Sequence, residues 1–278
     1  MKSFLGVEYS RGACANPTDG GPALAPSVVK EMFPNADWTM IFPATVDMDA
    51  CRADRFGDTL QIHKQIYSAT PTAPHVLIGG DHSVNFGHFA TLADRMPNDD
   101  LYLIYIDAHL DIHTPQSSRA EASGAPHGTN VRALLGDGDQ RWLDLQAKCP
   151  ALKPENIFYL ASRSYEPSEI KFVTENNIFM RHAEQLQTMT DCVNALNDIR
   201  DRIGNRPYIV SFDFDAINPR YFRDVWVPEN GGISVQMAEY FTRELAPNAH
   251  SFEFVEYAPT GDEQSAQIVK TLVAIAAQ

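Results

Sequence analysis

The sequence predicts an α/β fold in which a mostly parallel sheet is covered by helices. Short β-rich runs alternate along the chain with stretches of helical period, and this alternation is typical of parallel sheets. With 278 residues, of which 44% are hydrophobic, the chain can bury a full core. It contains no internal repeat, low-complexity tract or long linker, so we expect a single domain over residues 1–278.

The β-rich runs give the expected strands in chain order. They occupy residues 4–8, 40–43, 75–78, 101–106, 157–160, 208–214 and 251–256. The segments of helical period lie between them, at residues 53–68, 83–95, 166–176, 191–203, 236–245 and 262–277. Several of these begin with Ser, Asp or Glu, as helix N-termini prefer. Two other stretches, 11–26 and 114–130, are expected to be long loops, which in compact domains are usually functional.

The charge balance limits the classes of partner. With 22 Lys and Arg against 36 Asp and Glu, the formal net charge is −14, which argues against a nucleic-acid partner. No apolar run approaches the ~18 residues of a membrane span, and the first residues do not resemble a signal peptide. We therefore expect a cytoplasmic protein. The four cysteines show no CxxC spacing, so reduced thiols are expected, while pairing of Cys14 with Cys51 stays open.

Two segments carry metal-type ligands at every second residue, directly after strongly apolar runs. Asp107, His109 and Asp111 form the first set, and Asp213 and Asp215 form the second. Side chains of an extended chain alternate between faces, so each set is expected to point to one side. Carboxylates gathered this closely raise one another's pKa values unless positive charge compensates them. Divalent cations supply that charge, and the spacing therefore predicts a two-metal site.

A third segment, GGDHS at residues 79–83, adds an imidazole. Taken alone it is a weak signal, because a glycine pair makes a tight turn and Asp81 or Ser83 can cap the next helix. In an open parallel sheet, however, ligands bind beyond the carboxyl ends of the strands. His82, Asp107 and Asp213 all follow such ends. Three separate segments are therefore expected to converge on one edge of the sheet.

Several motifs resemble those of the ureohydrolases, the family of arginases, agmatinases, formimidoylglutamases and other guanidino-acid hydrolases. They are GGDHS at 79–83, DAHLD at 107–111, ASGAPHG at 122–128, SFDFDAINP at 211–219 and VEYAP at 255–259. The resemblance covers nearly the whole chain, since Gly20-Gly21-Pro22 also matches an early family loop. It implies an arginase-like three-layer αβα sandwich that holds two manganese ions per chain.

The resemblance also assigns metal ligands. His82 and Asp111 match the ligands of one ion, His109 and Asp215 match those of the other, and Asp107 and Asp213 match the residues that bridge both ions. Mixed carboxylate and imidazole ligands suit Mn²⁺, and such a site also accepts Fe²⁺, Co²⁺ or Zn²⁺.

The same resemblance implies a hydrolytic mechanism. A guanidinium carbon is a poor electrophile, and two cations about 3.5 to 4 Å apart can share one water and lower its pKa toward 7. The implied nucleophile is a metal-bridging hydroxide, and Asp107, which would bridge the same two ions, counts among the catalytic residues. Glu256 matches the residue that binds the guanidinium, and His127 matches the proton shuttle for the leaving amine. Asp81, beside His82, is expected either to hydrogen-bond the bridging oxygen species or to orient the site.

The residues expected to bind the far end of the substrate depart partly from the family pattern. Glu166 falls where an arginase acid meets the α-amino group, and Ser123 keeps a hydroxyl of the carboxylate clamp. His113 and Ala125 instead replace asparagines of that clamp. With His113, Ser123 and Glu166 reading an amino-acid head group, the leading hypothesis is an enzyme that hydrolyses L-arginine or a modified arginine to an ornithine-like amine and urea or a urea derivative.

Other functions stay open as alternatives. Within the family these are agmatinase, guanidino-acid hydrolase and formimidoylglutamase. A catalytically silent metal-binding paralogue is disfavoured because all the ligand positions, His127 and Glu256 are present. A two-metal phosphoesterase needs cations for the phosphate, and Arg163 is the nearest candidate in the motif segments. We expect a small guanidino substrate as partner, no nucleic acid, no membrane, and a homo-oligomeric assembly.

Overall fold

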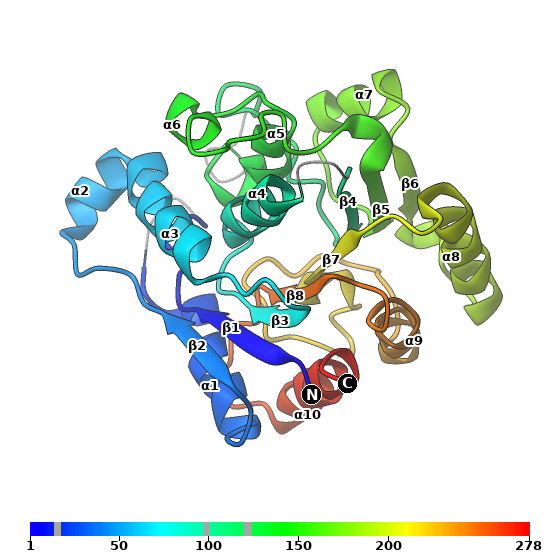
Figure 1. Cartoon of the computed structure of the whole chain (residues 1–278). Coiled ribbons are helices and arrows are strands. Elements are labelled where there is room, and N and C mark those ends of the chain that lie inside the picture. Colours follow the sequence, from blue (N-terminus) through cyan, green and yellow to red (C-terminus); the bar gives the residue numbers. More distant parts are fainter. Residues whose placement is uncertain (14–17, 97–99, 119–123) are drawn as a thin grey trace.

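A computed structural model describes residues 1–13, 18–96, 100–118 and 124–278. In this part of the chain, eight strands form one sheet in which every neighbouring pair is parallel (Figure 1). The strands are β1 (Ser3–Val7), β2 (Trp38–Ile41), β3 (His75–Ile78), β4 (Tyr102–Ile106), β5 (Ile157–Ser162), β6 (Phe179–His182), β7 (Tyr208–Asp213) and β8 (Ser251–Val255). Their order across the sheet is β2-β1-β3-β8-β7-β4-β5-β6.

The strand order brings the sequence motifs together. β3, β8, β7 and β4 are consecutive neighbours in the sheet. GGDHS follows β3, VEYAP begins at the last residue of β8, SFDFD overlaps the end of β7, and DAHLD follows β4. Because these strands run in the same direction, all their carboxyl ends lie at one edge of the sheet. The four motifs are therefore adjacent in space although they are distant in sequence.

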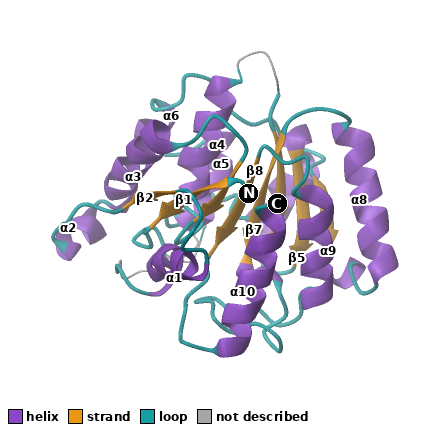
Figure 2. Ribbon diagram, turned by 60° about the horizontal axis from the view of Figure 1, so that its bottom comes forward, coloured by secondary structure: helices purple, strands orange, loops and turns teal. Residues whose placement is uncertain are grey.

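Helices cover both faces of the sheet, which confirms the three-layer αβα architecture (Figure 2). They are α1 (Ala25–Met32), α2 (Met48–Ala53), α3 (Arg55–Ala69), α4 (Val84–Arg95), α5 (Asn130–Leu134), α6 (Gln140–Leu143), α7 (Pro167–Glu175), α8 (Met189–Ile203), α9 (Val235–Leu245) and α10 (Glu263–Ala276). Helices α1, α8, α9 and α10 contribute to the core on one face. Helices α3 to α7 contribute to the cores on the other.

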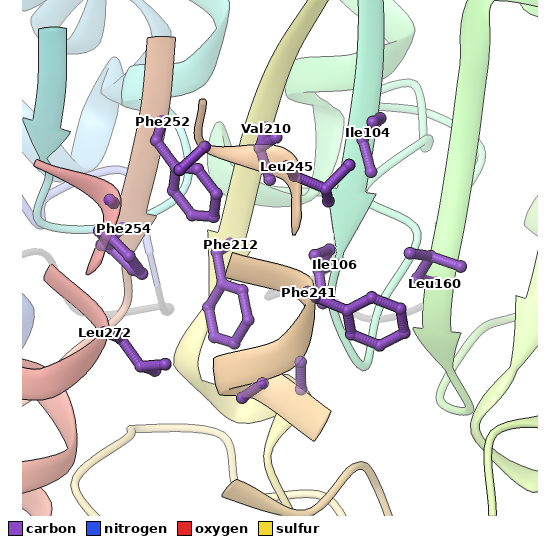
Figure 3. Packing of buried hydrophobic residues seen from close by; sticks show 14 of the residues in the cluster. Ile104, Ile106, Leu160, Val210, Phe212, Phe241, Leu245, Phe252, Phe254 and Leu272 are labelled. Carbon is purple, nitrogen blue, oxygen red and sulfur yellow. The ribbon is translucent and has the colours of Figure 1, made fainter. Parts of the chain in front are cut away.

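The alternation of side chains along the strands produces these two cores. In β4, Ile104 and Ile106 pack in the core that includes Phe241 of α9, as Figure 3 shows. Leu103 and Tyr105 of the same strand pack in the core that includes α4 and α5. Burying an apolar side chain of this size contributes ~1.5 to 3 kcal/mol. A strand covered on both faces is apolar throughout, which explains the uninterrupted apolar runs in the sequence.

The structure adds elements that the sequence pattern did not predict. Strand β6 is a four-residue edge strand containing Arg181 and His182, so it lacks the apolar character of the central strands. Helices α2, α5 and α6 span four to six residues, too few for a recognisable period. Helix α1 begins at Ala25, inside the stretch 11–26 that was expected to be a loop.

Two general expectations can be compared with the described residues. None of the described helices has the length and apolar character that crossing a membrane requires. Cys51, Cys149 and Cys192 carry free thiols. Cys14 lies outside the described residues, so its pairing stays open. The first and last segments meet, because the backbone nitrogen of Lys2 donates a hydrogen bond to the carbonyl of Ala277 at 2.9 Å.

Candidate metal centre

The DAHLD segment begins where β4 ends, and a turn rather than a strand places its side chains. The backbone nitrogen of His109 donates a 2.6 Å hydrogen bond to Oδ1 of Asp107. This bond folds the chain back on itself, as in an Asx turn. Asp111 has a φ of 48°, a left-handed conformation that is strained for a residue other than glycine. The side chains of Asp107, His109 and Asp111 do converge, as expected. The expected cause, the alternation of side chains along an extended strand, is wrong, because a turn brings them together.

The second aspartate pair is built in the same way. The backbone nitrogen of Asp215 donates a 2.7 Å hydrogen bond to Oδ1 of Asp213. Residues Phe214–Ala216 form a short 3-10 turn, so the strand ends at Asp213 and not at Phe214 as expected. The backbone nitrogen of Ala108 donates to Oδ1 of Asp215 at 3.0 Å and ties the two turns together.

His82 completes the cluster from the turn before α4. Its Nδ1 lies 3.0 Å from Oδ2 of Asp107, 3.3 Å from Oδ2 of Asp111 and 3.4 Å from Oδ2 of Asp213. On the other side, Nδ1 of His109 lies 2.9 Å from Oδ2 of Asp215 and 3.5 Å from Oδ1 of Asp107.

The side chains fall into two groups that could each hold a metal ion. One consists of His82, Asp107 and Asp111, and the other of Asp107, His109 and Asp215. Asp107 is common to both, as a bridging ligand must be, and Asp213 lies beside the first group. The structure thus brings together all six residues that the sequence suggested as ligands.

The electrostatics of the cluster fit a bound cation. Burial together with the charge of Asp107 raises the pKa of Asp111 to about 7, and burial together with Asp215 and Asp107 raises that of Asp213. Despite burial, the carboxylates of Asp107 and Asp213 raise the pKa of His82. Oδ2 of Asp107 is buried and has no hydrogen-bond partner in the described part of the chain. An unpartnered buried oxygen facing an imidazole nitrogen is a suitable place for a divalent ion.

Glu256 joins the same site from the end of β8. Its φ of 62° turns the side chain out of the sheet direction, and its Oε1 accepts a 2.9 Å hydrogen bond from the backbone nitrogen of His82. The residue is 9% exposed, and burial and the charge of Asp81 raise its pKa well above the usual value. A cationic partner would stabilise the ionised form of this buried carboxyl, which burial otherwise disfavours.

His127 reaches the site from the loop before α5, and it is fixed there by the segment after β1. Its Nδ1 lies 3.1 Å from the carbonyl of Gly12 and donates to it. Oδ2 of Asp81 holds this segment by accepting hydrogen bonds from the backbone nitrogens of Gly12 and Ala13 at 2.8 and 2.9 Å. Asp81 thus holds the backbone of Gly12, and the carbonyl of Gly12 holds His127. This chain of hydrogen bonds is the way in which Asp81 could orient the site.

The cluster opens into a cavity of about 110 Å³. The described residues that line it are His109, Asp111, His113, His127, Gly128, Glu169, Asp213, Asp215, Val225, Val227 and Glu256. Four of the six candidate metal ligands thus face one space together with Glu256 and His127. The two valines give it an apolar wall.

The residues proposed for the far end of the substrate lie together beside this cavity. Nε2 of His113 is 3.2 Å from Oε2 of Glu169 and 3.6 Å from Oε1 of Glu166. Glu166 also accepts a 2.8 Å hydrogen bond from the hydroxyl of Ser118. Glu169, and not Glu166, is among the described residues that line the cavity. Ser123 lies outside the described residues.

Sequence reasoning missed three residues. Glu169 follows Glu166 by three positions, and this spacing forms a capping box at the start of α7, a signal that could have been noticed. Ser211 lies 2.8 Å from Nε2 of His82. Glu229 lies 3.6 Å from Nε2 of His109. Ser211 begins the SFDFDAINP motif, two residues before Asp213, so its spacing was a usable signal, whereas Glu229 belongs to none of the motifs.

The chain was compared with known proteins. It matches the model of the arginase family over residues 5–278. The arginase of Entamoeba histolytica is 30% identical over 192 residues, which are 67% of this chain and 62% of that protein. The arginase of Bacillus subtilis is 30% identical over 195 residues, 68% of this chain and 63% of the relative. The match spans less than two thirds of either relative's length.

Solved structures show the same fold. The crystal structure of Entamoeba histolytica arginase in complex with L-ornithine has a TM-score of 0.84 at 22% identity, covering 99% of this chain and 96% of that one. Formimidoylglutamase from Bacillus subtilis has a TM-score of 0.73 at 16% identity, covering 99% and 85%. The resemblance found in the sequence motifs is confirmed by the family match over nearly the whole chain. The chain belongs to the arginase family of ureohydrolases.

Proposed function

We propose that the chain is a binuclear manganese hydrolase that cleaves the guanidino group of an arginine-type substrate into an ornithine-like amine and urea or a urea derivative. The observation that carries this proposal is the shared cavity. Two potential metal groups with Asp107 in common open into the same space as Glu256 and His127. A guanidino group in that space would meet a carboxylate, a proton carrier and the metal ligands at once.

The residues fit two divalent ions. His82 and Asp111 would hold one ion and His109 and Asp215 the other, with Asp107 and Asp213 shared. Oxygen-rich sites with imidazole ligands favour Mn²⁺ over soft-metal chemistry. Two such ions, when bound, lower the pKa of a shared water toward neutrality.

The remaining residues bind the substrate and move its protons. Glu256 is held by the backbone of His82, so its carboxylate can pair with guanidinium N–H groups at a fixed place above the ligands. Since Nδ1 of His127 donates to Gly12, Nε2 of its ring is an acceptor. It can therefore take up a proton and deliver it to the departing nitrogen.

An amino-acid substrate is supported by the charges beside the cavity. Glu166 and Glu169 face one imidazole, that of His113. Even if His113 is protonated, the two carboxylates leave a net negative charge there, which would attract the ammonium group of a substrate. Agmatine, simple guanidino acids and formimidoyl-glutamate are the alternatives within the family. Arg163 gives little support to a phosphoesterase, because its guanidinium is bonded to the carbonyls of Ala161, Asp215, Glu229 and Asn230.

Metal analysis and a substrate panel test the proposal. We expect about two ions per chain, and release of urea or hydroxyurea from arginine-type substrates above release of urea from agmatine or of formamide from formimidoyl-glutamate. Asp107→Asn should abolish turnover, because Asp107 belongs to both metal groups. Full turnover in metal-free protein would overturn the two-metal proposal. A preference for agmatine in the wild type would replace the arginine-type assignment with an agmatinase.

The proposal also covers the organisation of the chain. We propose that residues 1–278 form one ureohydrolase domain that assembles as a homo-oligomer. Membership of all eight strands in one sheet supports the single domain. A single cooperative unfolding transition and sedimentation at a multiple of the 30.9 kDa chain mass would be the expected results.

A further inference from the structure

A buried polar network lies between the sheet and α4, behind the metal centre. Its members are His75 of β3, Asn85 and His88 of α4, Ser211 of β7 and Glu253 of β8, all of them buried. Ser211 and Glu253 are register partners on neighbouring strands, so their side chains are on the same face of the sheet. Asn85 and His88 are three residues apart and share one face of α4. None of these side chains lines the cavity among the described residues.

Glu253 is the centre of this network. His88 donates from Nδ1 to Oε1 of Glu253, and Asn85 donates to Oε2 at 2.7 Å. Ser211 contributes a further side-chain hydrogen bond. Although burial opposes ionisation, the charge of His88 and these hydrogen bonds lower the pKa of Glu253. Glu253 is therefore an ionised carboxylate, and a carboxylate can only accept hydrogen bonds.

Counting protons fixes the state of the two histidines. His75 makes a 2.9 Å contact from Nδ1 to the carbonyl of Ala73, and its Nε2 lies 2.7 Å from Nε2 of His88. Burial and the charge of His88 lower the pKa of His75 to about 3, so His75 is neutral, donates to Ala73 and accepts from His88. His88 then donates from both nitrogens, to His75 and to Glu253.

The ionised state of Glu253 also determines the direction of the hydrogen bond between Ser211 and His82. Since Glu253 only accepts, the hydroxyl of Ser211 must donate to it, and the Ser211 oxygen is left as an acceptor. That oxygen lies 2.8 Å from Nε2 of His82. His82 must therefore carry its proton on Nε2. Nδ1, which faces Asp107, Asp111 and Asp213, would then be the nitrogen that binds a metal ion in place of its own proton.

We propose that the buried His75–His88–Glu253 network is a positioning device that acts through Ser211 to hold the metal ligand His82 in its binding tautomer. The inference rests on the proposed metal centre and extends it to residues that touch neither the ions nor the substrate. Positioning residues behind metal-bound histidines typically change metal affinity by about 10- to 100-fold.

The test is a double-mutant cycle read by metal binding. Metal-free wild type, Ser211→Ala, Glu253→Gln and the double variant are titrated with Mn²⁺ by calorimetry. Each single variant should weaken one of the two binding events about 10- to 100-fold. The double variant should lose no more than the worse single variant, because the two residues act in series. Unchanged affinity in Ser211→Ala, or losses that add in the double variant, would overturn the inference.

Controls separate positioning from general damage to the core. His63→Phe removes another fully buried histidine, which packs against Phe86 and Trp142 and has no hydrogen-bond partner among the residues that the structure describes. It should bind Mn²⁺ as the wild type does, and an equal loss there would overturn the inference. Ser211→Thr keeps the hydroxyl and should restore affinity relative to Ser211→Ala. Ser211→Ala removes a single oxygen, so it serves as the test even where Glu253→Gln does not fold.

The coordination of the ion gives a second readout. Co²⁺-loaded Ser211→Ala should show shifted visible absorption bands, whereas Co²⁺-loaded His63→Phe should match the wild type. A wild type that binds no metal would overturn the proposed function itself. A wild type that binds two ions, with unaltered affinity and spectra in the network variants, would overturn only the positioning role.

Discussion

His127 tests the proposed reaction at the scale of a single residue. Burial lowers its pKa to about 4, so the imidazole is neutral at pH 7 and can accept a proton. General acid–base groups contribute about 10²- to 10⁴-fold to rate. His127→Ala should therefore lower kcat at saturating substrate by at least ~100-fold, while metal content stays unchanged. His182→Ala, at a histidine outside the cavity lining, is the matched control, and an unaltered kcat in His127→Ala would remove the proton-transfer role.

Glu166 tests substrate selectivity. Truncating one charge of a buried, hydrogen-bonded pair usually costs ~2 to 5 kcal/mol in binding, and the cost at Glu166 should be smaller because its side chain is 25% exposed. Glu166→Ala should therefore weaken kcat/KM for α-amino-acid substrates by at least tenfold, and should affect agmatine much less. The measurement is kcat/KM on both substrate classes with the same enzyme preparation.

Glu169 provides the comparison for that experiment. Its carboxylate accepts hydrogen bonds from the backbone nitrogens of Ile112 and Glu166, so it also supports the fold beside the cavity. Glu169→Gln should consequently lower thermal stability as well as turnover on every substrate. If Glu166→Ala loses all guanidino substrates equally, its role is structural, and the amino-acid preference has no support.

At the scale of elements, Asp81 connects the segment after β1 to the loop that carries His127. One of its oxygens accepts from Gly12 and Ala13, and the other accepts from the backbone nitrogen and hydroxyl of Ser83. Asp81→Asn replaces one of these acceptors by a donor, which leaves buried N–H groups unpaired at ~1 to 3 kcal/mol.

We expect Asp81→Asn to show the same kind of loss as His127→Ala, but a smaller one. Asp81→Asn should lower kcat and the free energy of unfolding while both metal ions stay bound. Ser83→Ala removes only the hydroxyl, leaves the hydrogen bonds to Gly12 and Ala13 in place, and should keep most of the turnover. Loss of metal in Asp81→Asn, measured by elemental analysis, would show that Asp81 acts on the ligands and not on the His127 loop.

At the scale of the whole molecule, the metal centre couples stability to pH. A group whose pKa is raised by folding stabilises the protein below its unfolded pKa, and this contribution is lost as the pH rises through the folded value. The pKa of Asp111 rises from 3.8 to about 7. Despite burial, the neighbouring carboxylates raise the pKa values of His82 and His109. The contribution of these three groups to the stability of the metal-free protein should therefore be lost from about pH 4 upward through neutrality. The buried His75 and His127, whose pKa values are lowered, contribute in the opposite direction.

The measurement is the melting temperature in a chelator and with added Mn²⁺. Between pH 5 and 8, the Tm of the wild type in the chelator should fall relative to that of metal-free Asp111→Asn. The increase in Tm on adding Mn²⁺ should be larger at pH 8, because fewer protons compete for the ligands. An ion present at 100 times its dissociation constant stabilises by ~2.7 kcal/mol. Metal-free Asp111→Asn should show a weaker pH dependence than the wild type. An equal change of Tm with pH in the metal-free wild type and in metal-free Asp111→Asn would contradict the coupling.

Much of the fold and the ligand set could be predicted from the sequence. Apolar runs covered on both faces, separated by segments of helical period, determine a parallel α/β sheet, because only such a sheet buries uninterrupted apolar strands. Asp107, His109 and Asp213 could be proposed as ligands because a closely spaced cluster of carboxylates and imidazoles has no packing role. The motifs around His127 and Glu256 indicated the family, which the match over residues 5–278 confirms.

Tertiary structure alone decided how these residues meet. The insertion of β8 between β3 and β7 brings Glu256 to His82, and no local pattern encodes that order. The candidate ligands after β4 are brought together by turns and by the left-handed backbone of Asp111. They lie beyond the end of the strand, so the alternation of side chains along a strand does not place them. Glu253 lies 42 residues from Ser211, and their pairing depends on strand register. Hydrogen bonds between distant segments depend on packing, and for that reason the network behind His82 is visible only in the folded chain.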